Sequence, residues 1–366
     1  MTLVDELGSA VPAAWRPALA AVRREWFIPD RMWVDLGDGH VAVDRAAEPD
    51  RWLRAVRSDR AIITQWDDGA TVWPDTGAHA TCSASQPSVV AGMLDALDVH
   101  EGHRVLEIGT GTGYNSALLA HRLGADGVVS VEVDPVLADQ ARKRLVAAGH
   151  PVRVVTGDGA DGWPDAAPFD RVIVTANVML GQFPDVWIEQ TRPGGAVLAP
   201  LGTTLTSGPL VRFEVGEDRT AVGRPVPCYV DFMELRAQRR PIAPWPSDDG
   251  DGDSGTTRVR PWELFHLDPL WTIALRLPGC HWRHQPPVGD RGRHVLWLLD
   301  PQSGSWATAS YGRHAGAGPW PVRQHGPRRL WDEAEAAYRW WDDQGRPPVD
   351  SWRFTITPDA QAVELG

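Results

Sequence analysis

The sequence predicts an α/β fold with a doubly wound parallel sheet, followed by a smaller Trp-rich α+β extension. Two observations predict this. Short apolar runs alternate with helical segments between residues 105 and 199, and the first run ends in a glycine-rich turn. Beyond residue 229 the pattern changes, because 11 of the 19 Trp residues lie there among short alternating runs.

The glycine-rich turn follows an apolar strand that ends near Glu107. Gly109, Gly111 and Gly113 alternate, which lets the backbone turn sharply and pass close to a ligand. The spacing differs from that of dinucleotide sites, and no phosphate-loop Gly-Lys-Ser/Thr follows. A carboxylate at the strand end suits a cationic ligand. The combination points to S-adenosylmethionine, whose sulfonium and amino groups are positive, although a glycine-rich loop alone is also compatible with a simple tight turn.

The later strands follow the same plan. Glu132 ends the second strand about 20 residues after the loop, where a ribose diol needs an acceptor. Asp158 lies between two glycines after the third strand, where it can accept a hydrogen bond from an adenine amino group. The alternatives are a solvated strand-end charge for Glu132 and an ordinary Asp-Gly turn for Asp158. Strands are predicted at 105–108, 128–134, 152–155, 172–175 and 196–199, with helices at 117–123 and 135–148.

Four segments carry a resemblance to a known family. They are residues 23–29 (RREWFIP), 83–87 (SASQP), 157–176 (GDGADGW to VIVTA) and 193–202 (PGG to APLG). Together they resemble the protein-L-isoaspartate O-methyltransferases, over residues 17–235. The SASQP run is the most specific of the four, because it resembles that family's substrate loop, which methyltransferases in general lack.

The resemblance implies a Rossmann-like class I methyltransferase that binds S-adenosyl-L-methionine and releases S-adenosyl-L-homocysteine. It also implies that Ser85 lies beside the transferred methyl group and serves catalysis by hydrogen-bonding the substrate. Substrate contacts are expected at Ser83, Gln86, Thr175, Ala176, Pro200, Leu201 and Gly202. Cofactor contacts are expected at Glu107, Ile108, Gly109, Thr110, Gly111, Gly113, Tyr114, Asn115, Glu132, Val133, Gly157, Asp158 and Gly159.

Two departures favour a particular branch of the family. Residues 58–69 lengthen the region before the substrate loop, and the part after about residue 230 has no expected counterpart in a repair enzyme. Both features resemble the homologues that modify ribosomally made peptides (lanthipeptides, lasso peptides and graspetides). The implied partner is a ring-constrained precursor peptide, whose methylated Asp gives aspartimide and/or isoaspartate. The alternatives are a general L-isoaspartyl repair methyltransferase and a non-catalytic peptide-recognition protein that binds S-adenosylmethionine.

Four regions are predicted along the chain: 1–80 (N-terminal helix and substrate-side insertion), 81–235 (cofactor domain), 236–257 (acidic flexible linker) and 258–366 (peptide-recognition domain). In the last region, residues 271–275, 294–299 and 306–311 read as strands, and 329–341 as an amphipathic helix. Its Trp residues either fill a core or line a peptide groove.

The composition argues against several classes of protein and of binding site. A net charge of −12 and a pI of about 5.4 argue against sequence-independent nucleic-acid binding. Three cysteines make a disulfide framework unlikely, and no apolar stretch is long enough for a membrane span, so a cytoplasmic protein is expected. No metal is expected, because residues 249–253 lack the remaining ligands of a calcium loop and Cys280 has no partner pair. Ser85 lies neither in a Gly-x-Ser-x-Gly motif nor in a strand-turn-helix signal, so the sequence argues against a serine hydrolase.

Overall fold

The computed structural model describes residues 3–37, 39–240, 244–245, 252–287, 292–312 and 318–366. They divide into two compact units. Unit 1 consists of Met1–Pro200, Leu210–Gln238 and Arg353–Glu364. Unit 2 consists of Leu201–Pro209, Arg239–Trp352 and Leu365–Gly366.

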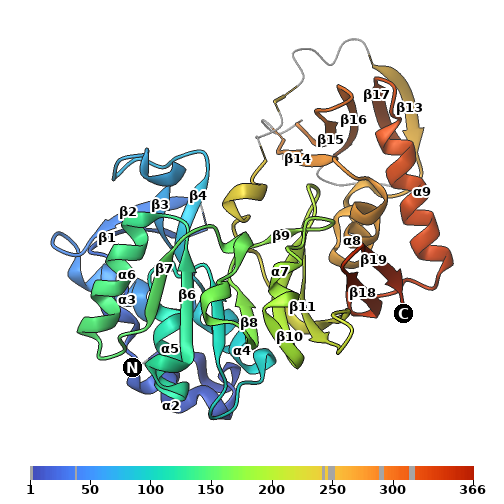
Figure 1. The fold of residues 1–366 in the computed structure, drawn as a ribbon. Coiled ribbons are helices and arrows are strands. Elements are labelled where there is room, and N and C mark those ends of the chain that lie inside the picture. Colours follow the sequence, from blue (N-terminus) through green and yellow to red (C-terminus); the bar gives the residue numbers. More distant parts are fainter. Residues whose placement is uncertain (1–2, 38, 241–243, 246–251, 288–291, 313–317) are drawn as a thin grey trace. The chain divides into compact units, whose positions relative to one another are not determined.

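The centre of unit 1 is a parallel sheet in the strand order β10-β8-β5-β6-β7 (Figure 1). All residues of β5, β6 and β8 are buried, as is typical of parallel strands covered on both faces. Asp134 caps the helix that follows β6 and is succeeded by a proline in the first turn, which fixes where that helix begins. The five predicted strands and both predicted helices are confirmed. The elements are β5 (Val105–Ile108), α5 (Tyr114–Leu123), β6 (Val128–Glu132), α6 (Pro135–Ala147), β7 (Arg153–Thr156), β8 (Phe169–Val174), α7 (Val186–Glu189) and β10 (Thr191–Gly202).

The same sheet continues beyond β10 through strands from two distant parts of the chain. Its order on that side is β19-β18-β12-β11-β10, and β18 pairs antiparallel with β12. The final strands therefore belong to the sheet of unit 1, whereas the sequence assigned them to the C-terminal domain. The overlooked signal is the alternation of Trp352, Phe354 and Ile356, all of which are buried. The strands are β9 (Val178–Met179, paired with β10), β11 (Ser207–Val215), β12 (Ala221–Tyr229), β18 (Trp352–Thr357) and β19 (Ala360–Leu365).

A separate four-stranded sheet precedes the parallel one, in the order β2-β1-β3-β4. One face packs on a helix through a cluster that includes Met32, Trp52 and Ile62. Residues 58–69 are part of this sheet, because they contain β3 and the turn that follows it. The strands and helices before β5 are α1 (Leu3–Leu7), α2 (Arg16–Ala21), β1 (Arg31–Asp35), β2 (His40–Asp44), α3 (Pro49–Arg57), β3 (Ile62–Trp66), β4 (Ala80–Ala84) and α4 (Pro87–Leu97).

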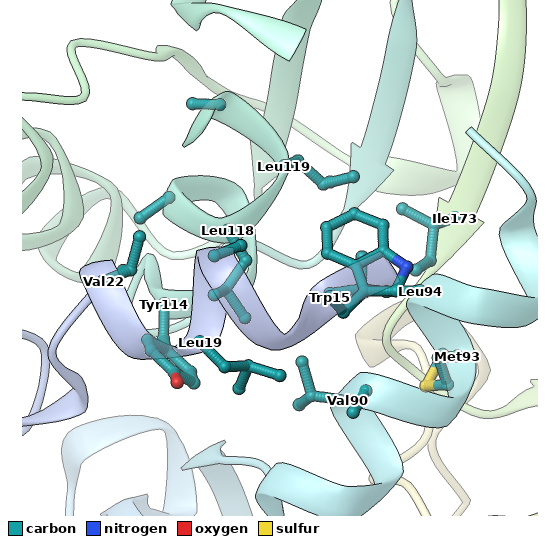
Figure 2. Packing of buried hydrophobic residues seen from close by; sticks show 14 of the residues in the cluster. Trp15, Leu19, Val22, Val90, Met93, Leu94, Tyr114, Leu118, Leu119 and Ile173 are labelled. Carbon is teal, nitrogen blue, oxygen red and sulfur yellow. The ribbon is translucent and has the colours of Figure 1, made fainter. Parts of the chain in front are cut away.

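The main core of unit 1 joins the N-terminal helices to the parallel sheet. Trp15 and Leu19 share one buried cluster with Leu94 of α4, Leu118 of α5 and Ile173 of β8 (Figure 2). Apolar burial of this kind contributes about 25 cal/mol per Å². The segment from Leu3 to Val22 thus helps to hold α4 and α5 in place, and α4 begins at the last residue of the SASQP run.

Unit 2 is an antiparallel sheet with helices on one face. The sheet order is β13-β17-β16-β15-β14. Leu298 and Ala307 of the sheet share a cluster with Ile273 of α8 and Trp331 of α9. Seven of the 11 Trp residues after residue 229 are buried, namely Trp271, Trp297, Trp306, Trp320, Trp331, Trp341 and Trp352, which favours core filling for these positions. The elements are β13 (Asp253–Thr257), α8 (Leu267–Arg276), β14 (His281–Gln285), β15 (Arg293–Asp300), β16 (Ser305–Gly312), β17 (Trp320–His325) and α9 (Leu330–Asp343).

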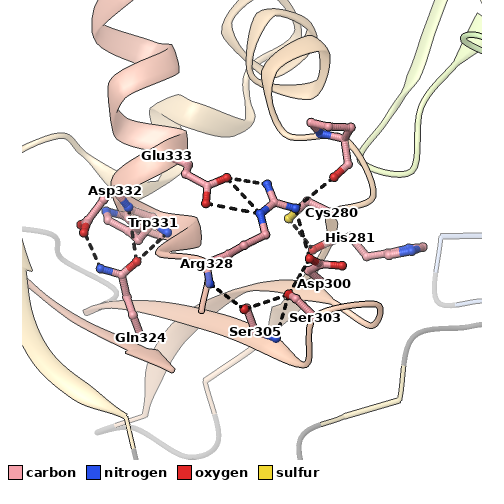
Figure 3. A network of polar contacts seen from close by, with 11 residues as sticks. Cys280, His281, Asp300, Ser303, Ser305, Gln324, Arg328, Trp331, Asp332 and Glu333 are labelled. Atoms are coloured by element: carbon pink, nitrogen blue, oxygen red, sulfur yellow. Dashed lines mark hydrogen bonds and ion pairs between the residues drawn. The ribbon is translucent and has the colours of Figure 1, made fainter. Parts of the chain in front are cut away.

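A polar network fixes the start of α9 (Figure 3). Arg328 forms ion pairs with Glu333 and, at 3.2 Å, with Asp300. The hydrogen bond and ion pair with Glu333 raise the pKa of Arg328. Gln324 of β17 accepts a hydrogen bond from the Trp331 amide at 2.8 Å, so that β17 and α9 are joined directly.

Two predictions in this region are wrong, those for residues 271–275 and for the linker, and part of the linker lies outside the described residues. Residues 271–275 form part of α8 instead of a strand, because a short run buried all round fits either element and its periodicity does not decide between them. The predicted linker ends early, since its last five residues form β13. Residues 241–243 and 246–251 of that linker lie outside the described residues. The strands predicted at 294–299 and 306–311 and the helix at 329–341 are confirmed.

Replacing Phe354 with Ala is expected to lower the free energy of unfolding of unit 1 by about 3–5 kcal/mol, because a buried ring leaves a cavity in the sheet. Urea denaturation measures this loss. The control is Val136→Ala, a change at an exposed position of α6 that should cost less than about 0.5 kcal/mol. A loss for Phe354→Ala as small as the control's would show that β18 adds nothing to the sheet's stability.

Candidate functional site

The glycine-rich turn after β5 has a backbone that only glycine adopts without strain. Gly109, Gly111 and Gly113 have φ values of +94°, +53° and +91°. A Cβ atom on Gly109 would lie 2.6 Å from the Thr175 Oγ1 atom, which is closer than non-bonded contact allows. The turn therefore needs glycine for two reasons, its left-handed backbone and the close approach of β8.

The strand ends around this turn are hydrogen-bonded to one another. The Gly109 amide donates to the Val131 carbonyl at 2.9 Å, and the Gly157 amide donates to the Glu132 carbonyl at 3.0 Å. The Thr175 hydroxyl donates to the Gly109 carbonyl at 2.7 Å. The carboxyl ends of β5, β6, β7 and β8 thus form one rigid edge, where ligands bind in open α/β sheets.

Glu107 is used entirely within the protein. Its carboxylate accepts hydrogen bonds from Asn115 at 2.7 Å, from Ser130 at 2.6 Å and from Ser116. The residue has no exposed surface, and burial raises the pKa of its carboxyl group. No surface of Glu107 is exposed in this arrangement, and the expected contact between Glu107 and the cofactor stays a prediction. Glu107 ties the start of α5 to β6, a positioning role.

Glu132 orients the glycine-rich turn. Its Oε2 atom accepts from the Gly111 amide at 2.8 Å, and its Oε1 atom accepts from the Asp134 amide at 3.0 Å. Burial raises the pKa of this carboxyl group, although 6% of the residue remains exposed. Each carboxylate oxygen has a further lone pair, so Glu132 can still accept from a ligand hydroxyl.

The end of β7 presents an exposed carboxylate. Asp158 is exposed, and its Oδ1 atom accepts from the Ala160 amide at 2.9 Å. A Cβ atom on Gly159 would lie 2.5 Å from the Ile108 Cγ2 atom, so only glycine lets the turn after β7 approach Ile108 at the end of β5 this closely. Val133, 37% exposed, adds an apolar surface beside Glu132. These residues are together at one edge, as the sequence predicts.

The predicted substrate loop, residues 83–87, joins β4 to α4. Arg24 binds the backbone of this loop, because its guanidinium donates to the Ala84 carbonyl at 3.0 Å and to the Ser85 carbonyl at 2.9 Å. It also donates to the carbonyls of Val56, Ser58 and Arg60. Arg24 is buried, which lowers its pKa to about 10. Ser85 follows a strand and precedes a helix, so the prediction that it lacks a strand-turn-helix setting is wrong. The missing Gly-x-Ser-x-Gly motif is then the remaining argument against a serine hydrolase.

A second clamp on the loop comes from the 58–69 segment. The Asp59 carboxylate accepts from the Ser88 amide at 2.9 Å, at the start of α4, and from the Gln86 side chain at 3.1 Å. The loop also approaches the glycine-rich turn, since a Cβ atom on Gly111 would lie 3.5 Å from the Ser83 carbonyl oxygen. The predicted substrate and cofactor loops are therefore neighbours.

Several predicted site residues lie in the interior instead. Tyr114 lies within the buried cluster (Figure 2). Its ring packs against Phe27 with centroids 5.7 Å apart, and burial raises the pKa of its hydroxyl. Ile108 fills the space beside Gly159 and is 1% exposed. The predicted substrate contacts Pro200, Leu201 and Gly202 are buried at the end of β10. The contacts expected at these positions stay predictions, and their burial shows that a motif tells where the chain passes and not which side chains face outward. Thr110 and Gly113 are also buried, whereas Ser83, Ser85, Gln86, Gly109, Gly111, Asn115, Gly157, Thr175 and Ala176 are partly exposed.

The clamps at Arg24 and Asp59 were missed as site residues. Arg24 belongs to the RREWFIP segment, but its distance of about 60 residues from Ser85 gives no local sign that the two meet. Asp59 lies in the segment that was interpreted as a recognition insertion. Among the described residues, no group of three or more His, Cys, Asp or Glu side chains is arranged to hold a metal ion. None of the helices described is long and apolar enough to cross a membrane.

Comparisons with known proteins agree with this geometry. A family profile described as protein-L-isoaspartate(D-aspartate) O-methyltransferase matches residues 57–234, a range that includes segment 58–69. A protein-L-isoaspartate O-methyltransferase of Anaeromyxobacter dehalogenans (strain 2CP-1) is 45% identical over 188 residues, 49% of this chain and 85% of that protein. The chain belongs to the protein-L-isoaspartate O-methyltransferase family. A second relative of that name, from Methanopyrus kandleri, is 44% identical over 121 residues, 32% of this chain.

The extent of the likeness differs between sequence and structure. The chain spans about half the length of some relatives that it matches, 53% for the M. kandleri protein and 55% for one from Anaeromyxobacter sp. (strain Fw109-5). A solved structure titled protein-L-isoaspartate O-methyltransferase has a TM-score of 0.54 and 20% identity, and it covers 99% of this chain and 98% of its own. That likeness shows the fold alone. Since it extends over both units, the expectation that the C-terminal part has no counterpart in such a methyltransferase is wrong.

Replacing Arg24 with Lys is expected to loosen the substrate loop of this family member. A lysine cannot reach five carbonyl groups, and unpaired buried polar groups cost about 1–3 kcal/mol each. Hydrogen exchange should then become at least about tenfold faster at residues 83–88, in line with a loss of about 1.4 kcal/mol in local stability. Arg45→Lys, at an exposed ion pair with Asp30, is the control and should leave those amides unchanged. Unchanged exchange in Arg24→Lys would contradict the clamp.

Proposed function

We propose that the protein is an S-adenosylmethionine-dependent carboxyl O-methyltransferase that acts on L-isoaspartyl residues. The observation that carries this proposal is the juxtaposition of two loops. The backbone of the substrate loop lies against the glycine-rich turn at Ser83 and Gly111, so a methyl donor on the turn would have Ser85 nearby. Family membership supports the same reaction.

The exposed groups at the sheet edge fit S-adenosylmethionine. The turn at Gly109–Gly113 offers a close backbone approach, Glu132 retains capacity to accept ribose hydroxyls, and Asp158 can accept from the adenine amino group. Val133 supplies an apolar surface for the adenine ring. The described turn from Gly109 to Gly113 carries no lysine or arginine, which a polyphosphate site would need there.

The chain's own task in this reaction is alignment. When bound, S-adenosylmethionine supplies an electrophilic methyl group, and the substrate carboxylate forms the new O–C bond as the C–S bond breaks and its electron pair moves to sulfur. A carboxylate is already ionised near neutral pH, so the protein needs no strong general base. Ser85 can donate a hydrogen bond to the substrate carboxyl or its backbone, and Arg24 and Asp59 fix the loop that carries it. Alignment of this kind accounts for several kcal/mol of barrier.

A second candidate is an Asp carboxylate in a ring-constrained ribosomal peptide, with aspartimide and/or isoaspartate as the product. The observation that favours it is unit 2, which lies almost entirely outside the matched family profile. Within it, Trp245 is 48% exposed and Trp262, Trp282 and Trp340 are half-buried, so these four side chains remain available to a peptide. A constrained peptide also loses less entropy on binding.

The two candidates differ in the substrate that the full-length chain prefers. With equal concentrations of a linear isoaspartyl peptide, the matching linear Asp peptide and a macrocyclic Asp peptide, we expect methyl transfer to the isoaspartyl peptide to be at least about tenfold faster, a difference of about 1.4 kcal/mol in the barrier. Mass spectrometry of the methyl esters measures the rates. The linear Asp peptide serves as the control for nonspecific esterification. A faster reaction with the macrocycle would replace the first candidate by the second.

Replacing Ser85 with Ala should lower kcat by about 10- to 100-fold, because one aligning hydrogen bond is lost in the transition state. The dissociation constant for S-adenosylhomocysteine, measured by calorimetry, should change less than about twofold, since Ser85 contacts the substrate. Ser254→Ala, at an exposed position of β13, is the matched control and should leave both kcat and cofactor affinity unchanged. Loss of cofactor binding in Ser85→Ala, with the rate per bound cofactor retained, would contradict this role.

A further inference from the structure

A segment that follows β12 crosses the carboxyl ends of the parallel strands. The Asn177 amide, just beyond β8, donates to the Met233 carbonyl at 2.8 Å, and the Leu235 amide donates back to the Asn177 carbonyl at 3.0 Å. Three residues after Leu235, Gln238 accepts from the Met179 amide at 2.8 Å. Residues 233–238 are therefore fastened on both sides of Arg236, which brings this arginine to the edge where the cofactor groups lie.

Arg236 lies between two carboxylates from different segments. Its guanidinium is 3.1 Å from the Asp68 Oδ1 atom and 3.5 Å from the Asp134 Oδ2 atom. Asp134 is held further by Gln65, whose amide donates to the same Oδ2 atom at 3.0 Å. The Asp134 amide in turn donates to Glu132 at 3.0 Å. A chain of contacts thus leads from Arg236 through Asp134 to the proposed ribose acceptor.

The turn that presents Asp68 has an unusual backbone. Asp67 and Asp68 both have left-handed φ values, +47° and +54°. Such a conformation costs on the order of 1 kcal/mol per residue and persists where other contacts hold it. Here the Asp67 carboxylate accepts from Thr71, Ala78 and His79. The 58–69 segment is therefore built to present a carboxylate to Arg236.

We propose that Arg236 is a positioning residue of the cofactor site: held between Asp68 and Asp134, it keeps the Glu132 carboxylate in the place and charge state in which it accepts the ribose hydroxyls. This inference rests on the proposed function. It gives segment 58–69 a role in cofactor binding, beside its contact with the substrate loop.

The charges around Glu132 make Arg236 important. Burial and the Asp134 carboxylate after β6 raise the pKa of Glu132. The amides of Asp134 and Gly111 lower it by hydrogen bonding, and the Arg236 guanidinium lowers it as well. Glu132 in turn raises the pKa values of Glu107 on β5 and Cys82 on β4. Ligand affinity through an ionised carboxylate is complete above its pKa and falls as the pH decreases through it. Without Arg236 the pKa of Glu132 rises further, so the loss of affinity begins at a higher pH.

The test is calorimetric binding of 5′-methylthioadenosine to the full chain between pH 5 and 8. This probe keeps the adenine and ribose groups but lacks the amino-acid part. It therefore has no α-amino group whose titration would add to the pH dependence. Arg236→Gln should weaken binding about tenfold at neutral pH, as expected for the loss of a nearby charge, and move the midpoint of the pH dependence upward. Arg236→Lys should keep the midpoint close to that of the wild type. Arg224→Gln, at an exposed position of β12, removes the same charge and should change nothing.

A double-mutant cycle decides whether Arg236 acts through Glu132. Glu132→Gln should bind the probe weakly, and adding Arg236→Gln should weaken it by less than about twofold more. Equal affinity and equal pH dependence in wild type and Arg236→Gln would overturn the inference, as would a full tenfold loss in the Glu132→Gln background. If Arg236→Gln does not fold, Asp68→Asn takes its place, because it removes one of the two carboxylates that hold Arg236, and Arg236→Lys remains the control. Failure of the wild type to bind either S-adenosylmethionine or the probe would instead refute the proposed function.

Discussion

The arrangement of the site depends on one buried cation, the guanidinium of Arg24. Removing a charge from water costs several kcal/mol. Five carbonyl groups offset that cost, because hydrogen bonds from a charged donor are worth about 1.5–3 kcal/mol each. Although burial lowers its pKa to about 10, Arg24 stays protonated at neutral pH. Its acceptors belong to the end of α3, the approach to β3 and the Ser85 loop, so a single side chain fixes three segments at once.

The acidic residues at the sheet edge differ in how much of each carboxylate remains free for a ligand. Glu107 is consumed by hydrogen bonds within the protein, and Asp134 caps a helix and pairs with Arg236. Asp158 is exposed, and Glu132 is intermediate, with both oxygens engaged but capacity remaining. A rigid framework of buried carboxylates therefore surrounds a small number of groups that face outward. This division follows the exposure of each carboxylate and the hydrogen bonds that it already accepts within the protein.

The sequence was sufficient to predict the parallel sheet and its glycine-rich turn, because strand periodicity and glycine spacing are local. Contacts between distant segments were not predictable in this way. Arg24 and Ser85 lie 61 residues apart, and β12 pairs with β18 across more than a hundred residues. The direction of individual side chains was equally hidden: Glu107 and Tyr114 occupy motif positions but face the interior. At Trp271 the apolar run was visible, while its helical form depended on packing from all sides.

The pairing of β18 with β12 has a consequence for synthesis. Everything between Arg239 and Trp352 must leave the ribosome before the neighbour of β12 exists. At about 5–20 residues per second this takes on the order of ten seconds. Throughout that time β12 exposes unpaired amide and carbonyl groups, the feature by which sheets recruit foreign strands. The nascent chain is therefore most prone to aggregation late in translation, when its methyltransferase sheet is complete except for one edge, and chaperone binding would matter most then.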